Sequence, residues 1–196
     1  MKTINSAIEL VKNPVNYMTA NKDAPATRNE LLINYVAVLA AIPFLATLIG
    51  DLWYYGLIGL SGSFVGYAFV SAILEYVFSI IAVYVIAMVI RMLASNFSSS
   101  VDDTKSLKLA AFIYTPVFLI GVLDIIPPIA FITILGVLYG LYILYLGLPI
   151  VLGTPKDKVI GYVIAIVIVT IIVYVVIGFI IGAIDFALFR AGFGYF

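Results

Sequence analysis

The 196-residue sequence contains neither cysteine nor histidine. The chain therefore forms no disulfide bridge, carries no reactive thiolate and offers no imidazole ligand for a metal ion. Charged residues are scarce as well, at 10% of the chain, and the formal net charge is zero. Because nucleic-acid-binding domains carry a clustered basic excess, the sequence predicts no nucleic-acid partner.

Common catalytic motifs are also missing. The chain contains no glycine-rich phosphate loop, no serine nucleophile elbow and no zinc-binding HExxH motif. Catalysis would therefore have to use an acid or a tyrosine as its active group. We expect a non-enzymatic protein with no catalytic residue and no cofactor, and the sequence singles out no particular metal.

What the chain has in abundance is apolar side chains. Hydrophobic residues make up 65% of it and the mean hydropathy is +1.24, whereas soluble domains are about half apolar. Five segments reach the roughly 20 apolar residues that a spanning helix needs. Because they lack the alternation of barrel strands, the predicted fold is an all-α integral membrane protein with a bundle of five transmembrane helices. The predicted spans are residues 30–49, 67–93, 107–126, 128–152 and 159–184.

Basic residues occur in alternate gaps between these segments. Lys and Arg are enriched on the cytoplasmic side of membrane proteins. We therefore predict a cytoplasmic N-terminal segment over residues 1–29, a five-span domain over residues 30–184 and an outer C-terminal tail over residues 185–196. In a prokaryote this membrane would be the plasma membrane. Nine of the ten basic residues lie on the side predicted as cytoplasmic: Lys2, Lys12, Lys22, Arg28, Arg91, Lys105, Lys108, Lys156 and Lys158.

A short amphipathic helix is predicted near the N-terminus. Ile4, Ala7, Ile8 and Val11 fall at helical spacing before Pro14. A helix of this length is too short to cross a bilayer. Two alternatives are open: it lies on the inner membrane surface with its apolar stripe down, or it forms a frayed tail.

Local signals also predict where helices begin and where one is interrupted. Ser6 with Glu9, and Thr27 with Glu30, have the spacing of capping boxes at the start of the short helix and of the first span. Residues 50–66 contain five glycines, which argue against one straight helix. We predict an interfacial or re-entrant stretch there.

Two glycine pairs at a spacing of four residues lie in the last two spans. Gly136 with Gly140, and Gly178 with Gly182, give each helix a face that another helix can approach closely. Such a face serves either self-association between copies of the chain or contact within one bundle. The sequence leaves both alternatives open.

Four acids lie within or near the outer half of the predicted membrane region: Asp51, Glu75, Asp124 and Asp185. Glu75 is eight residues into the second predicted span, about 12 Å along a helix. A carboxylate at that depth is costly unless it faces the bundle interior, pairs or carries a proton. The functional hypothesis is an outward-facing acidic cavity for a cation, a proton or a polar lipid headgroup. The alternative is a structural carboxyl hydrogen-bonded between helices.

Tyrosine hydroxyls are the other polar groups of the spans. Tyr139, Tyr142 and Tyr145 form a stripe that lines a helix interface or, alternatively, a pore. Tyr114 lies in the third span. The resulting ligand-binding hypothesis names six residues: Glu75, Asp124, Asp51, Tyr114, Tyr139 and Tyr142.

Several short motifs follow one another along the chain: Asn13–Pro14, Asp51–Trp53, Tyr114–Pro116, residues 138–148, residues 154–158 and Gly161–Tyr162. Their order resembles that of the Yip family of Ypt/Rab-interacting membrane proteins, in particular its prokaryotic members. Five spans with a cytoplasmic N-terminus are that family's arrangement.

The resemblance implies a role in membrane traffic, with cytoplasmic parts that bind small GTPases and with association between family members. The predicted cytoplasmic tail is too short for a folded GTPase-binding domain. We therefore expect membrane organisation or recruitment of a protein partner at the cytoplasmic face, in contact with membrane lipids. The alternative hypothesis is a transporter or channel for a cation, proton or lipid that uses the acidic cavity.

Overall fold

The computed structural model describes residues 2–57 and 63–188, which are almost entirely helical and contain no strand. η1 is a π-helix and the other three η elements are 3₁₀-helices. In chain order the elements are α1 (Lys2–Lys12), α2 (Pro14–Asn21), η1 (Glu30–Ala37), α3 (Val38–Leu57), α4 (Ser63–Ala94), η2 (Ser95–Phe97), α5 (Asp103–Ile120), η3 (Gly121–Ile125), η4 (Pro127–Thr133), α6 (Ile134–Leu152) and α7 (Val159–Leu188).

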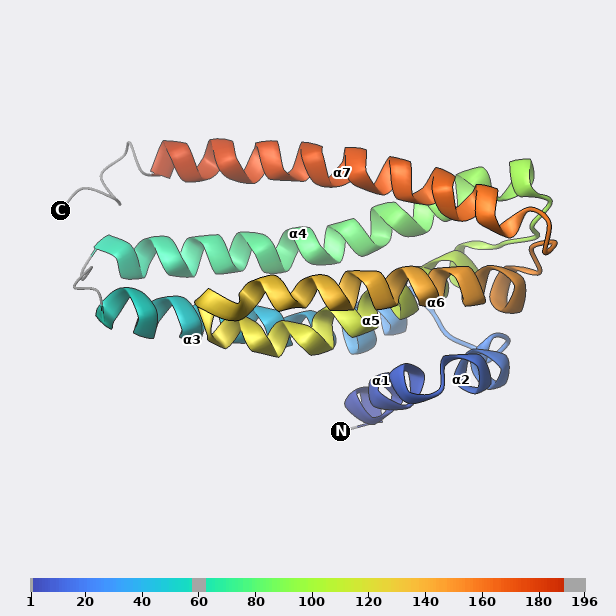
Figure 1. Cartoon of the computed structure of the whole chain (residues 1–196), viewed down its shortest axis with the longest axis horizontal. Coiled ribbons are helices and arrows are strands. Elements are labelled where there is room, and N and C mark those ends of the chain that lie inside the picture. The colour runs from blue at the N-terminus through green and yellow to red at the C-terminus, as the bar shows by residue number, and fades with distance from the viewer. Residues whose placement is uncertain (1, 58–62, 189–196) are drawn as a thin grey trace.

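Five helical stretches of the described chain are long and apolar enough to cross a membrane, which confirms the predicted fold class. Figure 1 shows them side by side along the long axis of the molecule. We call the end that carries the α4–α5 and α6–α7 loops the proximal end, and the end that carries the α5–α6 turn the distal end. The stretches are Glu30–Tyr54, Ala68–Phe97, Asp103–Ile125, Pro127–Leu152 and Val159–Ile184.

α5 lies at the centre of the bundle and α7 at its edge. The most apolar part of the α5 span is 67% buried, whereas that of the α7 span is only 6% buried. Small residues such as Ala110 and Ala111 allow α3, α4 and α6 to approach α5 closely. α7 is apolar on every side and packs chiefly against α4, so most of its side chains face the region that lipid would occupy.

The α5–α6 connection is a pair of 3₁₀-helices between two α-helices. The predicted spans 107–126 and 128–152 have nearly the right limits, but α5 ends at Ile120 and α6 begins only at Ile134. Pro127 begins η4, where the missing N–H of proline leaves no helical acceptor unpaired. The α5–α6 hairpin consequently stops short of the distal ends of α3, α4 and α7 (Figure 1).

The predicted end of the first span at residue 49 is wrong, because α3 runs on into the glycine-rich segment 50–66 as far as Leu57. The segment is not one straight helix, as predicted, since α4 begins separately at Ser63. α3 continues through Gly50. At this position the backbone of η3 approaches α3 so closely that there is no room for a Cβ atom. Trp53 then donates a hydrogen bond of 2.8 Å from Nε1 to the carbonyl of Ile125. Gly50 thus serves close packing, and residues 58–62 lie outside the described part of the chain.

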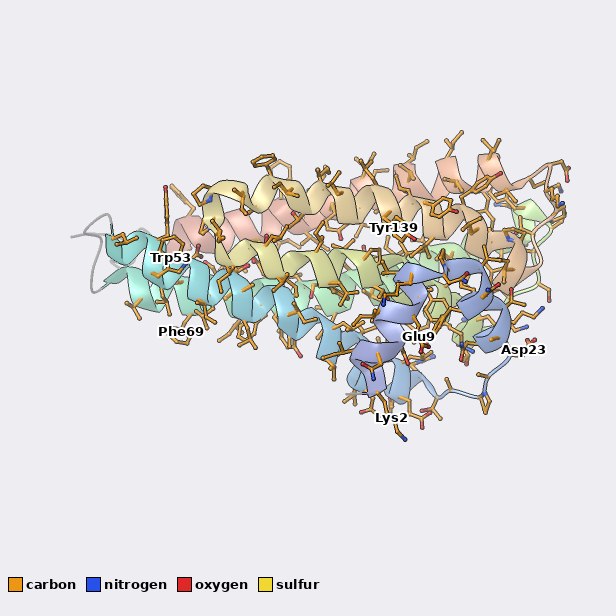
Figure 2. The ribbon with its side chains drawn as sticks, turned by 60° about the horizontal axis from the view of Figure 1, so that its bottom comes forward. Lys2, Glu9, Asp23, Trp53, Phe69 and Tyr139 are labelled. Carbon is orange, nitrogen blue, oxygen red and sulfur yellow. The ribbon has the colours of Figure 1, made fainter. Side chains whose placement is uncertain are left out.

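The N-terminal helices pack against the flank of the bundle near its proximal end. Ala7, Leu10 and Met18 are completely buried, and α1 and α2 contact α5 and α6. The Tyr139 hydroxyl donates a 2.7 Å hydrogen bond to the carbonyl of Val11. Figure 2 shows both helices on this flank, on the side of Tyr139. α1 is therefore a docked helix, and the prediction of a frayed tail is wrong.

Of the two predicted capping boxes, one forms. Glu30 Oε2 accepts a 2.8 Å hydrogen bond from the Thr27 backbone N–H, and Thr27 Oγ1 accepts one of 3.2 Å from the Glu30 N–H. The predicted cap at Ser6 is wrong, because α1 already begins at Lys2. The added first turn is mostly exposed, and the Thr3 hydroxyl ties it to η1 by donating a 2.9 Å hydrogen bond to the carbonyl of Asn34.

The two glycine pairs have different surroundings. A Cβ atom added to Gly140 would lie 2.6 Å from the carbonyl oxygen of Ile113, and one added to Gly136 would lie 2.9 Å from the Cα of Val117. α5 therefore occupies the face of this first pair. Added Cβ atoms at Gly178 and Gly182 would meet no atom of the described residues within 4 Å. Self-association through Gly178 and Gly182 stays a prediction. Self-association through Gly136 and Gly140 would require α5 to move away from α6.

Candidate functional site

A cavity of about 190 Å³ lies in the distal half of the bundle, walled by α3, α4, α5, η3, η4 and α7. We call it the acidic cavity, because two carboxyl groups line it. The remaining polar side chains that line it all carry hydroxyl groups. Its polar side chains are Thr47, Glu75, Tyr76, Ser79, Tyr114, Asp124, Thr133 and Tyr174.

Three of the six predicted ligand-binding residues meet at this cavity. Glu75 comes from α4 and Tyr114 from α5, and Asp124 comes from η3, the 3₁₀-helix that follows α5. Asp124 is half-buried and Glu75 is exposed. Carboxylates accept hydrogen bonds and attract cations, and hydroxyls both donate and accept. The cavity is therefore chemically suited to a cation or to a hydrogen-bonding headgroup.

Tyr174 of α7 is a cavity residue that the sequence reasoning missed. Its hydroxyl donates a 2.9 Å hydrogen bond to the hydroxyl of Tyr114. The Tyr114 residue as a whole is only 6% exposed. A tyrosine in an otherwise apolar span carries a hydroxyl that requires a partner, and this signal could have identified Tyr174. The hydrogen bond links the peripheral helix α7 to the central helix α5.

The other three predicted ligand-binding residues do not line the acidic cavity. Asp51 lies near the distal end of α3. Tyr139 points to the opposite flank, where it bonds to α1, and Tyr142 is 48% exposed on the surface of α6. The predicted position of the tyrosine stripe at a helix interface thus applies to Tyr139, whose hydroxyl bonds across to α1. No group of three or more acids that could hold a metal ion occurs among the described residues.

A second, larger cavity of about 620 Å³ lies between α6 and α7, with α4 and α5 beneath it. We call it the lateral groove. Apart from Tyr114, Thr170 and Tyr174 its side chains are apolar, and Thr170 donates its hydroxyl proton to the carbonyl of Ile166 in its own helix. Tyr114, Val117 and Tyr174 line both this groove and the acidic cavity, so the two spaces adjoin at the tyrosine pair.

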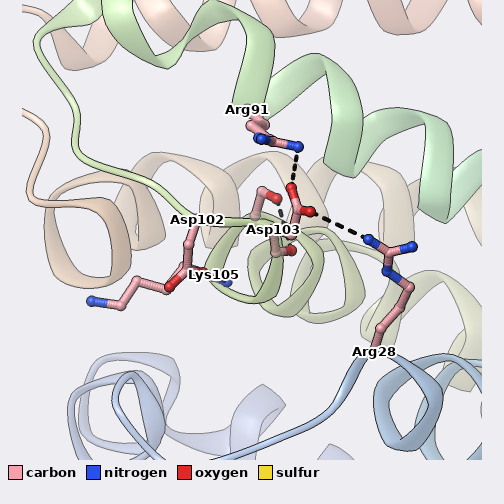
Figure 3. A network of polar contacts seen from close by, with 6 residues as sticks. Arg28, Arg91, Asp102, Asp103 and Lys105 are labelled. Carbon is pink, nitrogen blue, oxygen red and sulfur yellow. Dashed lines mark hydrogen bonds and ion pairs between the residues drawn. The ribbon is translucent and has the colours of Figure 1, made fainter.

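The proximal end is held together by an ion-pair network centred on Asp103, at the start of α5. Arg28 lies 3.2 Å from one carboxylate oxygen of Asp103, and Arg91 of α4 pairs with the other (Figure 3). Asp102 accepts a 2.7 Å hydrogen bond from the Lys105 backbone N–H and caps α5. The network connects the N-terminal segment, α4 and α5, although each exposed pair contributes at most about 1 kcal/mol.

Lys108 makes a buried polar contact at the proximal end. The side chain is only 4% exposed. Its ammonium donates hydrogen bonds of 2.9, 3.0 and 2.8 Å to the backbone carbonyls of Asn21, Lys22 and Ala24. These carbonyls lie at the C-terminal end of α2, where a cation also complements the helix dipole. Lys108 therefore fixes α2 to α5.

The two proximal loops are tied to each other as well. The hydroxyls of Ser99 and Thr154 are 2.8 Å apart, and Lys158 donates a 2.6 Å hydrogen bond to Ser98. The ring of Phe97 stacks on a ring of α7, that of Tyr162, with centroids 4.5 Å apart. The α4–α5 and α6–α7 loops thus form one connected surface.

Comparison with known families agrees with this architecture. The family model of the Yip1 domain matches residues 8–178, which include α2, all of α3 to α6 and most of α7. The chain belongs to the Yip family. The searches of curated proteins and of solved structures gave no match.

The match assigns the acidic cavity and the lateral groove to the Yip1 domain. Within the Tyr114–Pro116 motif, Tyr114 bonds to Tyr174 and the Thr115 hydroxyl lies 2.9 Å from that of Tyr35 in η1. These two contacts link α5 to helices on two sides.

Proposed function

We propose that this Yip-family protein is non-enzymatic and that it recruits a protein partner, or organises the membrane, through its proximal end. The supporting observation is the connected proximal surface. The N-terminal helices, α4 and α5 are joined by Asp103 and Lys108, and the two loops are joined by Lys158. A surface that is already ordered binds a partner without a large loss of conformational entropy.

We further propose that the proximal end faces the cytoplasm, with the C-terminus outside and, in a prokaryote, with the plasma membrane as the host membrane. The segments that carry nine of the ten basic residues all belong to the N-terminal segment or to the proximal end of the bundle. This distribution agrees with the enrichment of Lys and Arg on the cytoplasmic side.

Single-cysteine crosslinking tests both proposals without background labelling, because the natural chain has no cysteine. Glu9→Cys and Lys12→Cys, at exposed positions of α1, should form crosslinks to a discrete protein in native membranes. An impermeant maleimide should label them only after the membranes are opened. Ile168→Cys, at a 54% exposed position on apolar α7, serves as the control and should capture no such protein. Absence of any partner, together with solute flux in liposomes, would contradict recruitment.

A second candidate function is the binding or movement of a cation, proton or lipid at the acidic cavity. The specific observation that favours it is the presence of both Glu75 and Asp124 in one cavity within the membrane-spanning region. Acids inside transmembrane segments frequently mark ion or substrate sites. The cavity's volume of about 190 Å³ is enough for a small cation with part of its hydration shell.

Glu75→Gln should abolish cation binding or flux by the reconstituted protein. The substitution keeps the size of the side chain and removes the charge that attracts the cation. Isothermal titration and liposome flux assays would measure the loss. Asp51→Asn is the matched control, since Asp51 does not line the cavity, and it should leave both signals intact. Unchanged flux in the Glu75→Gln protein would eliminate the acidic cavity as the site.

A further inference from the structure

We propose that the acidic cavity and the lateral groove together bind one amphiphile, with a cationic ammonium head in the cavity and its hydrocarbon chain in the groove. The proposal rests on the second candidate function above and specifies its ligand class. The occupant is a lipid-like molecule dissolved in the bilayer, not a solute that arrives from water.

The groove has the composition and position of a site for a hydrocarbon chain. Its inner end is formed by fully buried apolar side chains, with Leu144 at 1% and Ile166 at 2% exposure. Its mouth is formed by Val137 of α6 and Ile171 of α7, which are 44% and 58% exposed. The groove therefore opens sideways between two helices toward lipid. A chain in it would replace lipid contacts with contacts to closely spaced side chains.

The two spaces are arranged along the bundle in the order that an amphiphile requires. Glu75 and Asp124 lie toward the distal end from the Tyr114–Tyr174 pair, and Leu144 and Ile166 lie toward the proximal end. A lipid of the distal leaflet points its head toward the distal surface and its chain toward the membrane centre. The observed order matches that direction.

The charge of the cavity selects the sign of the head. Two carboxyl groups line the cavity, and none of its described lining residues is a lysine or an arginine. An ammonium head would pair with these acids, whereas a sulfate or phosphate head would be repelled. The tyrosine hydroxyls at the junction offer further hydrogen bonds to the atoms that join head and chain.

Photolabelling of the full-length protein in phosphatidylcholine vesicles tests the proposal. The probe is a long-chain alkylamine with a diazirine near the end of its chain, and the comparison probe is the alkyl sulfate of the same chain. The amine should label groove residues such as Leu144 and Ile166, and the sulfate should not. Glu75→Gln should reduce labelling by the amine about tenfold, the effect of one hydrogen bond to a charged group, and Asp51→Asn should leave it unchanged.

Two pairs of tryptophan variants test the groove separately from the cavity. Val137→Trp and Ile171→Trp fill it from α6 and from α7 and should each reduce labelling severalfold. Leu138→Trp and Ile172→Trp, at neighbouring exposed positions outside the groove, should have no effect. The use of two helices guards against a variant that fails to fold.

The outcomes separate this proposal from the second candidate function. Equal labelling by amine and sulfate, or equal labelling of groove and control variants, would overturn the amphiphile site. If tetramethylammonium bound in a manner that depends on Glu75 while the groove variants had no effect, the cation cavity would stand and the amphiphile would not. If neither labelling by the alkylamine nor binding of tetramethylammonium depended on Glu75, both proposals would be contradicted.

Discussion

Gly140→Ala should destabilise the protein by about 2 kcal/mol or more, although alanine is the better helix former. The added methyl group would lie 2.6 Å from the carbonyl oxygen of Ile113. That oxygen belongs to the backbone of α5, which cannot rotate away as a flexible side chain would. The α5–α6 pair would have to separate, and packing against the central helix would be lost. Unfolding in mixed detergent micelles would measure the change.

Gly178→Ala is the matched control for this prediction. The position belongs to a glycine pair of the same spacing, but an added Cβ would meet no atom of the described residues within 4 Å. We therefore expect no destabilisation, or a gain of up to about 1 kcal/mol from helix propensity. Equal destabilisation of both variants would show that α6 does not approach α5 as closely as described. A loss of dimer in the Gly178→Ala variant would instead support self-association through this pair.

Lys108→Met should release the N-terminal helices from the bundle. Methionine retains the apolar stem and removes the ammonium that bonds to three carbonyls at the end of α2. We expect a loss of about 3 kcal/mol in docking. A hydrogen bond to a charged group contributes about 1.5–3 kcal/mol, and the cost of burying the ammonium offsets part of the sum over the three bonds. Amide exchange in residues 2–27 should become about a hundredfold faster, while exchange in α5 and α6 should change little.

Lys105→Met provides the control, one helical turn earlier on the same face of α5. Lys105 pairs with Asp23 at 3.2 Å, but the two side chains are 36% and 66% exposed. Such a pair contributes at most about 1 kcal/mol, and the N-terminal helices should stay docked. Equal protection of residues 2–27 in the Lys108→Met and wild-type proteins would show that apolar packing of α1 and α2 alone holds them.

Several features were predictable because they depend on local composition. The five apolar segments predicted the spans, and Thr27 with Glu30 predicted a cap that forms. Glu75 does line a cavity, but its side chain is exposed, so its depth in the span did not predict its burial. The prediction at Ser6 was wrong because α1 begins at Lys2, and its first turn bonds through Thr3 to Asn34 of η1, a contact between segments that are distant in sequence. α3 continues past the predicted end of the first span at residue 49, because a glycine that breaks a helix and a glycine that admits a neighbouring backbone have the same appearance in a sequence.

The sequence by itself determined that the chain is a helical membrane protein with five spans, because the bilayer requires long apolar helices whatever their arrangement. The tertiary structure decided which of the spans' polar groups share a cavity. It placed Asp124 with Glu75 and left Asp51 outside, and it paired Tyr114 with a tyrosine 60 residues away. Those choices depend on helix rotation and on the 3₁₀ turn after α5, which are set by packing between helices and not by hydropathy.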